Sequence, residues 1–137
     1  MHLIASFSTI NWLAVIACTI LSFVLGAFWH SVLFKKGWSA DSGSKYNSNN
    51  HGNPAVIFGL SAVLHIVAVV GLALLVGVNS TASQGLLLGL FVAIVWISTA
   101  IGVTYVFVGR TLRLFLIDAG FYVVFLALSG LILGVWH

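Results

Sequence analysis

The sequence feature that most limits the possible folds is the stretch at residues 112–136, which is almost continuously apolar and contains one carboxylate, Asp118. The hydrocarbon core of a membrane is about 30 Å thick, and an α-helix rising about 1.5 Å per residue crosses it in about 20 residues. An ionisable side chain in such a segment costs roughly 2.5–3.5 kcal/mol on insertion. We therefore predict a transmembrane helix in which Asp118 faces protein groups and has a partner.

Three further apolar segments of similar length lie at residues 12–34, 54–78 and 85–108. Only 5% of the residues are charged, whereas a soluble domain typically has about 25%. The chain could not cover a water-facing surface with so few charges. We therefore predict an all-α fold, an integral membrane bundle of four antiparallel transmembrane helices in a single domain over residues 1–137.

The connecting segments differ in charge, and this difference predicts the orientation of the chain. Segment 35–53 is a long polar loop rich in Gly, Ser and Asn, whereas 79–84 and 109–111 are short. All five basic residues lie on or next to loops 35–53 and 109–111: Lys35, Lys36, Lys45, Arg110 and Arg113. Basic loops stay in the cytoplasm, so we predict that these two loops are cytoplasmic and that both termini lie outside.

Five polar residues in the predicted helices are candidates for a site inside the membrane. Counting about 1.5 Å per residue from the cytoplasmic helix ends places His30 about 7 Å deep and Asp118 about 9 Å deep. Tyr105 and Tyr122 are within reach of that layer, and His65 lies deeper, at about 16 Å. Because lipid offers these groups no hydrogen-bond partners, we predict that they face one another in an intramembrane polar cluster.

Two interpretations of this cluster remain open. It could form a proton path or hold a small polar ligand or a cation, with His65 further in. Alternatively, Asp118 could form a structural ion pair, accepting from Arg113, Arg110, His30 or a tyrosine, and so hold the helix ends in register. We favour the structural interpretation.

The sequence shows no set of residues typical of catalysis or metal binding. Asp118 is the single carboxylate in the predicted helices, so a paired acid and base is absent. The histidines His30 and His65 lie at unequal depths, and no pair of histidines has the i, i+4 spacing of a metal site. We therefore predict no enzymatic activity, no catalytic residue, no metal and no cofactor.

Glycines and net charge bear on the partners of the chain. Gly85 and Gly89, like Gly130 and Gly134, have the four-residue spacing that allows close helix contact. Four helices leave much surface free, so we predict a homo-oligomer, most simply a dimer, embedded in the lipid bilayer. The net charge of +3 does not indicate nucleic-acid binding, because no basic run is long enough to follow phosphates.

Two stretches carry a family resemblance. The first contains Asn11, Trp12, Gly26, Trp29, His30, Phe34, Lys35 and Trp38, and the second contains Asp118, Ala119, Gly120, Phe121, Tyr122, Gly130 and Trp136. They resemble the opening and closing helices of the domain-of-unknown-function 1761 family, small bacterial membrane proteins. His30 stands where that family usually has Tyr, and Asp118 where an amide is common, a compensating exchange of one contact for another. The resemblance implies a protein of the inner membrane with no assigned activity.

The function that these features favour is that of a non-enzymatic structural or accessory membrane protein. The alternative is a small transporter or channel for a proton, a cation or a small polar ligand that uses the intramembrane cluster. A cavity that reaches Asp118 would favour the alternative, whereas a carboxylate that is buried and fully hydrogen-bonded would favour the structural role.

Overall fold

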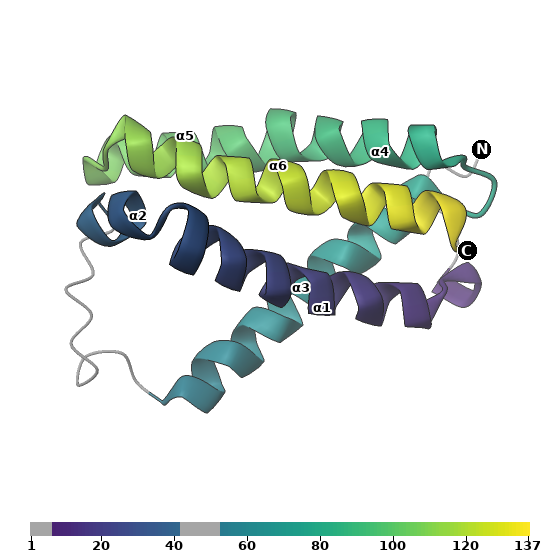
Figure 1. Cartoon of the computed structure of the whole chain (residues 1–137). Coiled ribbons are helices and arrows are strands. Elements are labelled where there is room, and N and C mark those ends of the chain that lie inside the picture. Colours follow the sequence, from purple (N-terminus) through teal and green to yellow (C-terminus); the bar gives the residue numbers. More distant parts are fainter. Residues whose placement is uncertain (1–6, 42–52) are drawn as a thin grey trace.

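The computed structural model describes residues 7–41 and 53–137, and within these ranges it contains helices and no strand. Figure 1 shows their arrangement. In order, the helical elements are a short 3₁₀ turn (Phe7–Thr9), α1 (Trp12–Phe28), a π-helical turn (Trp29–Leu33), α2 (Lys35–Asp41), α3 (Pro54–Val76), α4 (Ala82–Phe91), a π-helical segment (Val92–Ser98), α5 (Thr99–Val108) and α6 (Leu112–Val135).

Four spans in this structure are long and apolar enough to cross a membrane: Trp12–Leu33, Pro54–Val76, Ala82–Val108 and Leu112–Val135. The predicted all-α fold with four such helices is therefore confirmed. The third span begins at Ala82 rather than at residue 85, because Thr81 and Gln84 form a capping box in which each side chain accepts from the other residue's backbone N–H. The second span ends at Val76 because Gly77 adopts a positive φ of 69°.

The prediction of a continuous polar loop over residues 35–53 is wrong for its first part. Lys35–Asp41 forms the helix α2, which packs against α6. Gly37 allows this approach, because a Cβ there would lie 3.1 Å from Cδ1 of Ile117. At the end of α2, Asp41 accepts hydrogen bonds from Arg113. Tertiary contacts thus stabilise a helix that local composition does not predict; residues 42–52, the rest of the predicted loop, lie outside the described residues.

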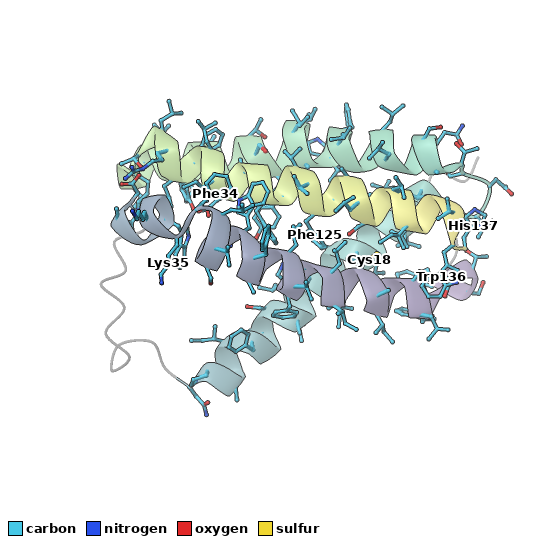
Figure 2. All side chains as sticks on the ribbon, in the orientation of Figure 1. Cys18, Phe34, Lys35, Phe125, Trp136 and His137 are labelled. Carbon is cyan, nitrogen blue, oxygen red and sulfur yellow. The ribbon has the colours of Figure 1, made fainter. Side chains whose placement is uncertain are left out.

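Helix α6 is the centre of the fold. It contacts α1, α2, α3, α4 and α5, and half of its membrane span is buried. The fully buried side chains of Phe125 and Ser129 on α6 and of Cys18 on α1 mark the interior. Figure 2 shows Phe125 and Cys18 in the middle of the molecule, between α1 and α6.

The glycines with four-residue spacing form the closest helix contact of the structure. Gly85 on α4 packs on Gly130 of α6, and a Cβ at either position would overlap the carbonyl oxygen of the other residue. Gly89 packs in the same way on Leu126, so residue numbers fall along α6 as they rise along α4. We name the contact of Gly85, Gly89, Gly130 and Gly134 the glycine seam. The prediction that these small residues mark helix contacts is confirmed.

Helix α3 diverges from the other helices over its first half (Figure 1). Its buried residues, Val69, Leu72 and Val76, all belong to its second half. In the first half, the side chains of Phe58 and Leu64 are 62% and 68% exposed. This divergence leaves space beside α1, α5 and α6 at the end of the molecule opposite to the glycine seam.

Candidate functional site

A cavity of about 600 Å³ occupies this space, and all five predicted polar residues line it. Four spans contribute to its walls, together with Trp38 of α2. The five residues come from the π-helical turn after α1, from α3, from α5 and from α6: they are His30, His65, Tyr105, Asp118 and Tyr122. Depth counting along separate helices therefore identified residues that the fold brings to one hollow.

Asp118 is the centre of a hydrogen-bonded network within the cavity wall. Its Oδ1 atom lies 3.2 Å from Nε2 of His30, and its Oδ2 atom accepts a short hydrogen bond from the hydroxyl of Tyr105. The network joins the π-helical turn, α5 and α6. The sequence left several partners of Asp118 open. In the structure, two of them contact it: His30 and Tyr105.

Both nitrogens of the His30 ring face oxygen atoms, and the number of hydrogen bonds that the ring donates depends on its protonation. Nδ1 lies 3.1 Å from the carbonyl oxygen of Gly26, and Nε2 faces the carboxyl group of Asp118. A neutral imidazole has one N–H and can satisfy one acceptor. The second hydrogen bond therefore needs one more proton, on His30 as an imidazolium or on Asp118 as a carboxylic acid. With both hydrogen bonds formed, the pair holds one shared proton and has no net charge.

The pair borders the cavity rather than being sealed within protein. The side chains of His30 and Asp118 keep 24% and 16% of their surface exposed. The rings of Trp38 and Phe121 lie against His30, with centroid distances of 5.3 and 5.4 Å. A solute in the cavity would thus meet aromatic faces and one ionisable pair.

Local helix geometry explains how His30 reaches Asp118. The turn Trp29–Leu33 is π-helical, and such widened turns are frequent at functional sites. The indole N–H of Trp29 donates to the carbonyl oxygen of Ile117 at 2.8 Å. Gly120 accommodates the ring, because a Cβ there would lie 3.2 Å from Cζ2 of Trp29. This bond holds the turn against α6 and so positions the adjacent His30.

His65 lies in the cavity wall but outside the Asp118 network. Its Nδ1 atom is 2.7 Å from the carbonyl oxygen of Ser61, one turn earlier on α3. Its ring packs against Phe23 and Phe125, at centroid distances of 5.7 and 5.4 Å. The Nε2 atom is buried and has no hydrogen-bond partner among the described residues. His65 therefore keeps a polar atom available in a largely aromatic surrounding.

Arg113 does not pair with Asp118. Its guanidinium binds Asp41 through two hydrogen bonds of 2.5 and 2.8 Å, and the Thr111 hydroxyl adds a third at 2.9 Å. These bonds, those from Arg113 first, hold the pKa of the Asp41 carboxyl below its usual range. The interpretation that Arg113 pairs with Asp118 is thus wrong, because α2 brings the carboxylate of Asp41 to Arg113.

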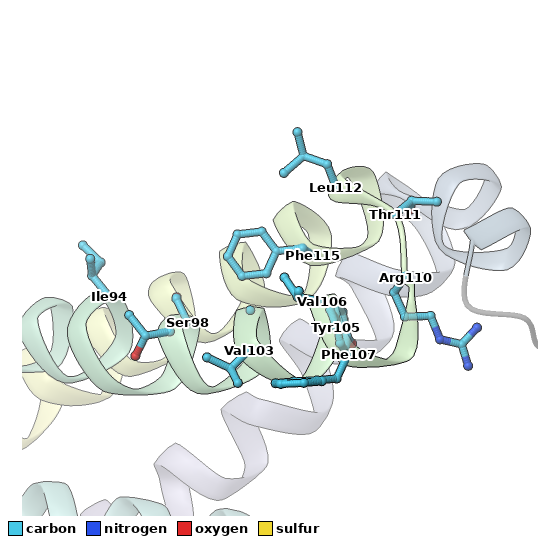
Figure 3. A pocket seen from close by; sticks show the side chains of 12 residues that line it. Ile94, Ser98, Val103, Tyr105, Val106, Phe107, Arg110, Thr111, Leu112 and Phe115 are labelled. Carbon is cyan, nitrogen blue, oxygen red and sulfur yellow. The ribbon is translucent and has the colours of Figure 1, made fainter.

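A second hollow of about 890 Å³ lies along α5 and α6, and it is mainly apolar (Figure 3). Val103, Phe107 and Phe115 line it, and Arg110 extends past the end of α5. Phe107 is 87% exposed, which suits a surface against acyl chains. Among the predicted cluster residues, Tyr105 alone also lines this groove, so the cavity at Asp118 is the better candidate site.

Sequence reasoning missed most of the aromatic wall of the cavity. Phe23, Phe58 and Phe121 are lining residues, as is Trp38 from the unpredicted helix α2. For one of these rings a signal was available, the glycine opposite it: a Cβ at Gly26 would lie 3.6 Å from the ring of Phe121. Within residues 7–41 and 53–137, no three His, Cys, Asp or Glu side chains cluster as the ligands of a metal ion would.

The four apolar spans and the polar cavity between them are compatible with a multi-pass membrane protein. The model of a family described as a protein of unknown function, DUF1761, matches residues 13–134. The chain therefore belongs to this family, as its two terminal stretches predict. Neither the curated proteins nor the solved structures provide a match.

Proposed function

We propose that this protein is a small membrane transporter that binds a polar or cationic solute in the cavity at Asp118 and carries it across the bilayer. The observation that supports this most is the cavity itself, which meets all five residues of the predicted cluster. A structural ion pair needs no hollow beside it. Ligand sites, in contrast, are concave, mostly apolar, and contain a few converging polar groups.

The cost of an acid in an apolar helix also supports a functional role. Ionisable side chains inside membrane segments usually belong to solute pathways or proton relays. Asp118 meets a titratable partner, His30, at 3.2 Å, and histidine changes charge at physiological pH. The pair can therefore accept or release a proton where a solute can reach it.

One observation favours a second candidate, the structural role. Both carboxyl oxygens of Asp118 are hydrogen-bonded, and the bonds join three helical elements. In this case the cluster would stabilise the helix ends and the cavity would hold only water or lipid. The two roles differ in what a substitution of Asp118 changes.

Flux measurements in proteoliposomes separate the two roles. Protons, methylammonium and glycerol serve as probes for the wild type and for the Asp118→Asn and Asp41→Asn variants. Asp41 is the other acid of the chain and lies outside the cavity, so its variant is the matched control. A transporter gives a flux of at least one probe that Asp118→Asn abolishes and Asp41→Asn leaves unchanged, with equal melting. No flux of any probe through the wild type would support the structural role.

The orientation of the chain in the membrane is part of the same proposal. Lys35 and Lys36 begin α2, and Arg110 and Arg113 flank the start of α6. These basic residues support a cytoplasmic location of residues 35–53 and 109–111, with both termini outside the inner membrane. An enzyme reporter that is active only in the cytoplasm should stay inactive when fused to His137.

A homo-oligomer, most simply a dimer, is part of the proposal as well. The exposed apolar side chains on the first half of α3, such as Phe58 and Leu64, offer a surface to a second copy. Cross-linking in mild detergent should give dimers, and a result of monomers alone would contradict this. The absence of enzymatic activity stays a prediction, as do the absence of a cofactor and of nucleic-acid binding.

A further inference from the structure

We infer that the cavity takes a monovalent organic cation with an aromatic or other bulky apolar body, and that each cation displaces the one proton held by His30 and Asp118. This inference rests on the proposed function and names the class of its solute. The chemistry of the walls and the proton count of the network carry it independently of each other.

The walls suit a cation with an apolar body. Aromatic rings from α1, α2, α3, α5 and α6 line the cavity, and the faces of such rings attract cations: they belong to Phe23, Trp38, Phe58, Tyr105, Phe121 and Tyr122. Among the described residues that line the cavity, Asp118 is the one carboxylate, and there is neither Lys nor Arg. An anionic solute would meet a carboxylate without a fixed positive charge to balance it. The volume of about 600 Å³ lies within the range of sites for drug-sized ligands.

The proton count explains why binding must be an exchange. With both hydrogen bonds of the His30 ring formed, to Gly26 and to Asp118, the pair holds one shared proton and carries no net charge before the cation binds. A bound cation with that proton still present would place an unbalanced positive charge among apolar side chains, which is costly. When the proton leaves, His30 keeps its N–H toward Gly26, and the Asp118 carboxylate balances the cation.

The exchange conserves charge and atoms. One cation with a single positive charge enters, the bond from the shared proton to His30 Nε2 or to Asp118 Oδ1 breaks, and that proton passes to water. The hydroxyl of Tyr105 keeps its hydrogen bond to Oδ2, so the carboxylate stays oriented. No redox step or further reactant is needed.

Three other titratable side chains line the cavity with the pair, whereas Arg110 and Arg113 do not. Tyr105 faces the pair from α5, Tyr122 from α6 and His65 from α3, and all of them line the cavity. Arg113 is bound by Asp41. Arg110 lines the groove along α5 and α6 rather than this cavity. The shared proton therefore belongs to the group that a bound cation would approach.

Binding of tetraphenylphosphonium to the full-length protein in detergent tests the inference. This ion has no ionisable hydrogen, so any proton released must come from the protein. We expect one proton per bound ion, measured with a pH-sensitive dye in weak buffer. By linkage, the affinity should rise about tenfold per pH unit over the range in which the pair holds its proton. Neutral triphenylphosphine oxide, of similar shape, should release none.

The Asp118→Asn variant tests whether the released proton comes from the His30–Asp118 pair. An asparagine can donate to a neutral His30 and accept from Tyr105, so the variant should keep its fold and melting while it loses proton release and at least tenfold in affinity. Asp41→Asn should behave as the wild type. The wild-type proton count and pH slope do not depend on any variant folding.

Binding without proton release, an affinity that does not change with pH, or no binding of tetraphenylphosphonium would overturn the inference. These failures differ from a failure of the proposed function. If an Asp118-dependent flux of glycerol or methylammonium persists, the solute class is wrong and the transporter proposal stands. If that flux is absent as well, both fall.

Discussion

The two ends of α6 are packed in opposite ways. At one end, Gly130 and Gly134 lie directly against the backbone of α4 and leave no room for a side chain. At the other end, Asp118, Phe121 and Tyr122 face a cavity of about 600 Å³. Small residues allow two backbones to meet, whereas rings and polar groups hold the helices apart. The comparison shows that one helix serves both as a rigid support and as the wall of a site.

The largest predicted effect concerns the closed end of α6, where Gly130 and Gly134 pack on α4. In Gly85→Ala, the new Cβ would overlap the carbonyl oxygen of Gly130 and lie 2.8 Å from its carbonyl carbon. Backbone atoms cannot yield as a flexible side chain can, so we expect a loss of about 3 kcal/mol in the free energy of unfolding. Loss of helical circular dichroism during titration with a denaturing detergent measures this.

Gly71→Ala is the matched control, because a Cβ at Gly71 would meet nothing within 4 Å. We expect this variant to be as stable as the wild type or slightly more stable, by up to about 1 kcal/mol, from the higher helix propensity of alanine. Equal stability of the two alanine variants would show that the glycine seam is not a close contact.

At the open end of α6, which borders the cavity, two substitutions of Asp118 should differ in how much they lower the free energy of unfolding. Asp118→Ala leaves the Tyr105 hydroxyl and His30 Nε2 without their partner, and we expect a loss of about 1–3 kcal/mol. Asp118→Asn keeps both hydrogen bonds with a neutral histidine, so its loss should stay below about 1 kcal/mol. The same detergent titration compares them, and an equal loss for both would contradict the network.

A smaller effect is expected for the bond that holds the π-helical turn. Trp29→Phe keeps an aromatic ring beside Gly120 but removes the indole N–H that donates to Ile117 at 2.8 Å. One neutral hydrogen bond contributes about 1 kcal/mol. We therefore expect a loss of that size in the free energy of unfolding, with Trp96→Phe, an exposed tryptophan, as the control that changes little.

The smallest effect belongs to the exposed ion pair between Asp41 and Arg113. Its bonds lower the pKa of Asp41, so the folded state binds the proton less readily than the unfolded state. The stabilisation is therefore present above the usual pKa of an aspartate, about 4, and is lost as the pH falls through the lowered value. Melting curves from pH 6 down to pH 2 should show this loss in the wild type and a smaller one in Asp41→Asn.

Sequence patterns predicted the parts of this fold that depend on the membrane as a solvent. Apolar length gave the four spans, and the helix rise per residue placed His30 about level with Asp118. In the structure, Nε2 of His30 lies 3.2 Å from Oδ1 of Asp118. The glycine spacing predicted the close contact of α4 with α6. Apolar length, depth along a helix and glycine spacing can all be read from the local sequence.

The remaining features depend on tertiary contacts that no local pattern contains. Helix α2 forms where Arg113 of α6 reaches Asp41, although a Gly- and Ser-rich composition favours a loop. The divergence of α3 follows from which half of it meets α1 and α6, and its apolar residues are spread over all of its faces. For this reason the cavity and its aromatic wall emerge only from the structure.

Thiol labelling measures most directly whether the open end admits solutes from water and the closed end does not. In a Cys18→Ala background, Ser61→Cys would place a thiol in the cavity wall and Ser129→Cys would place one in the fully buried interior of α6. In membrane vesicles, a water-soluble methanethiosulfonate reagent should modify the cysteine at position 61 at least tenfold faster than that at position 129. Equal protection of the two positions would contradict a cavity that serves as a solute site.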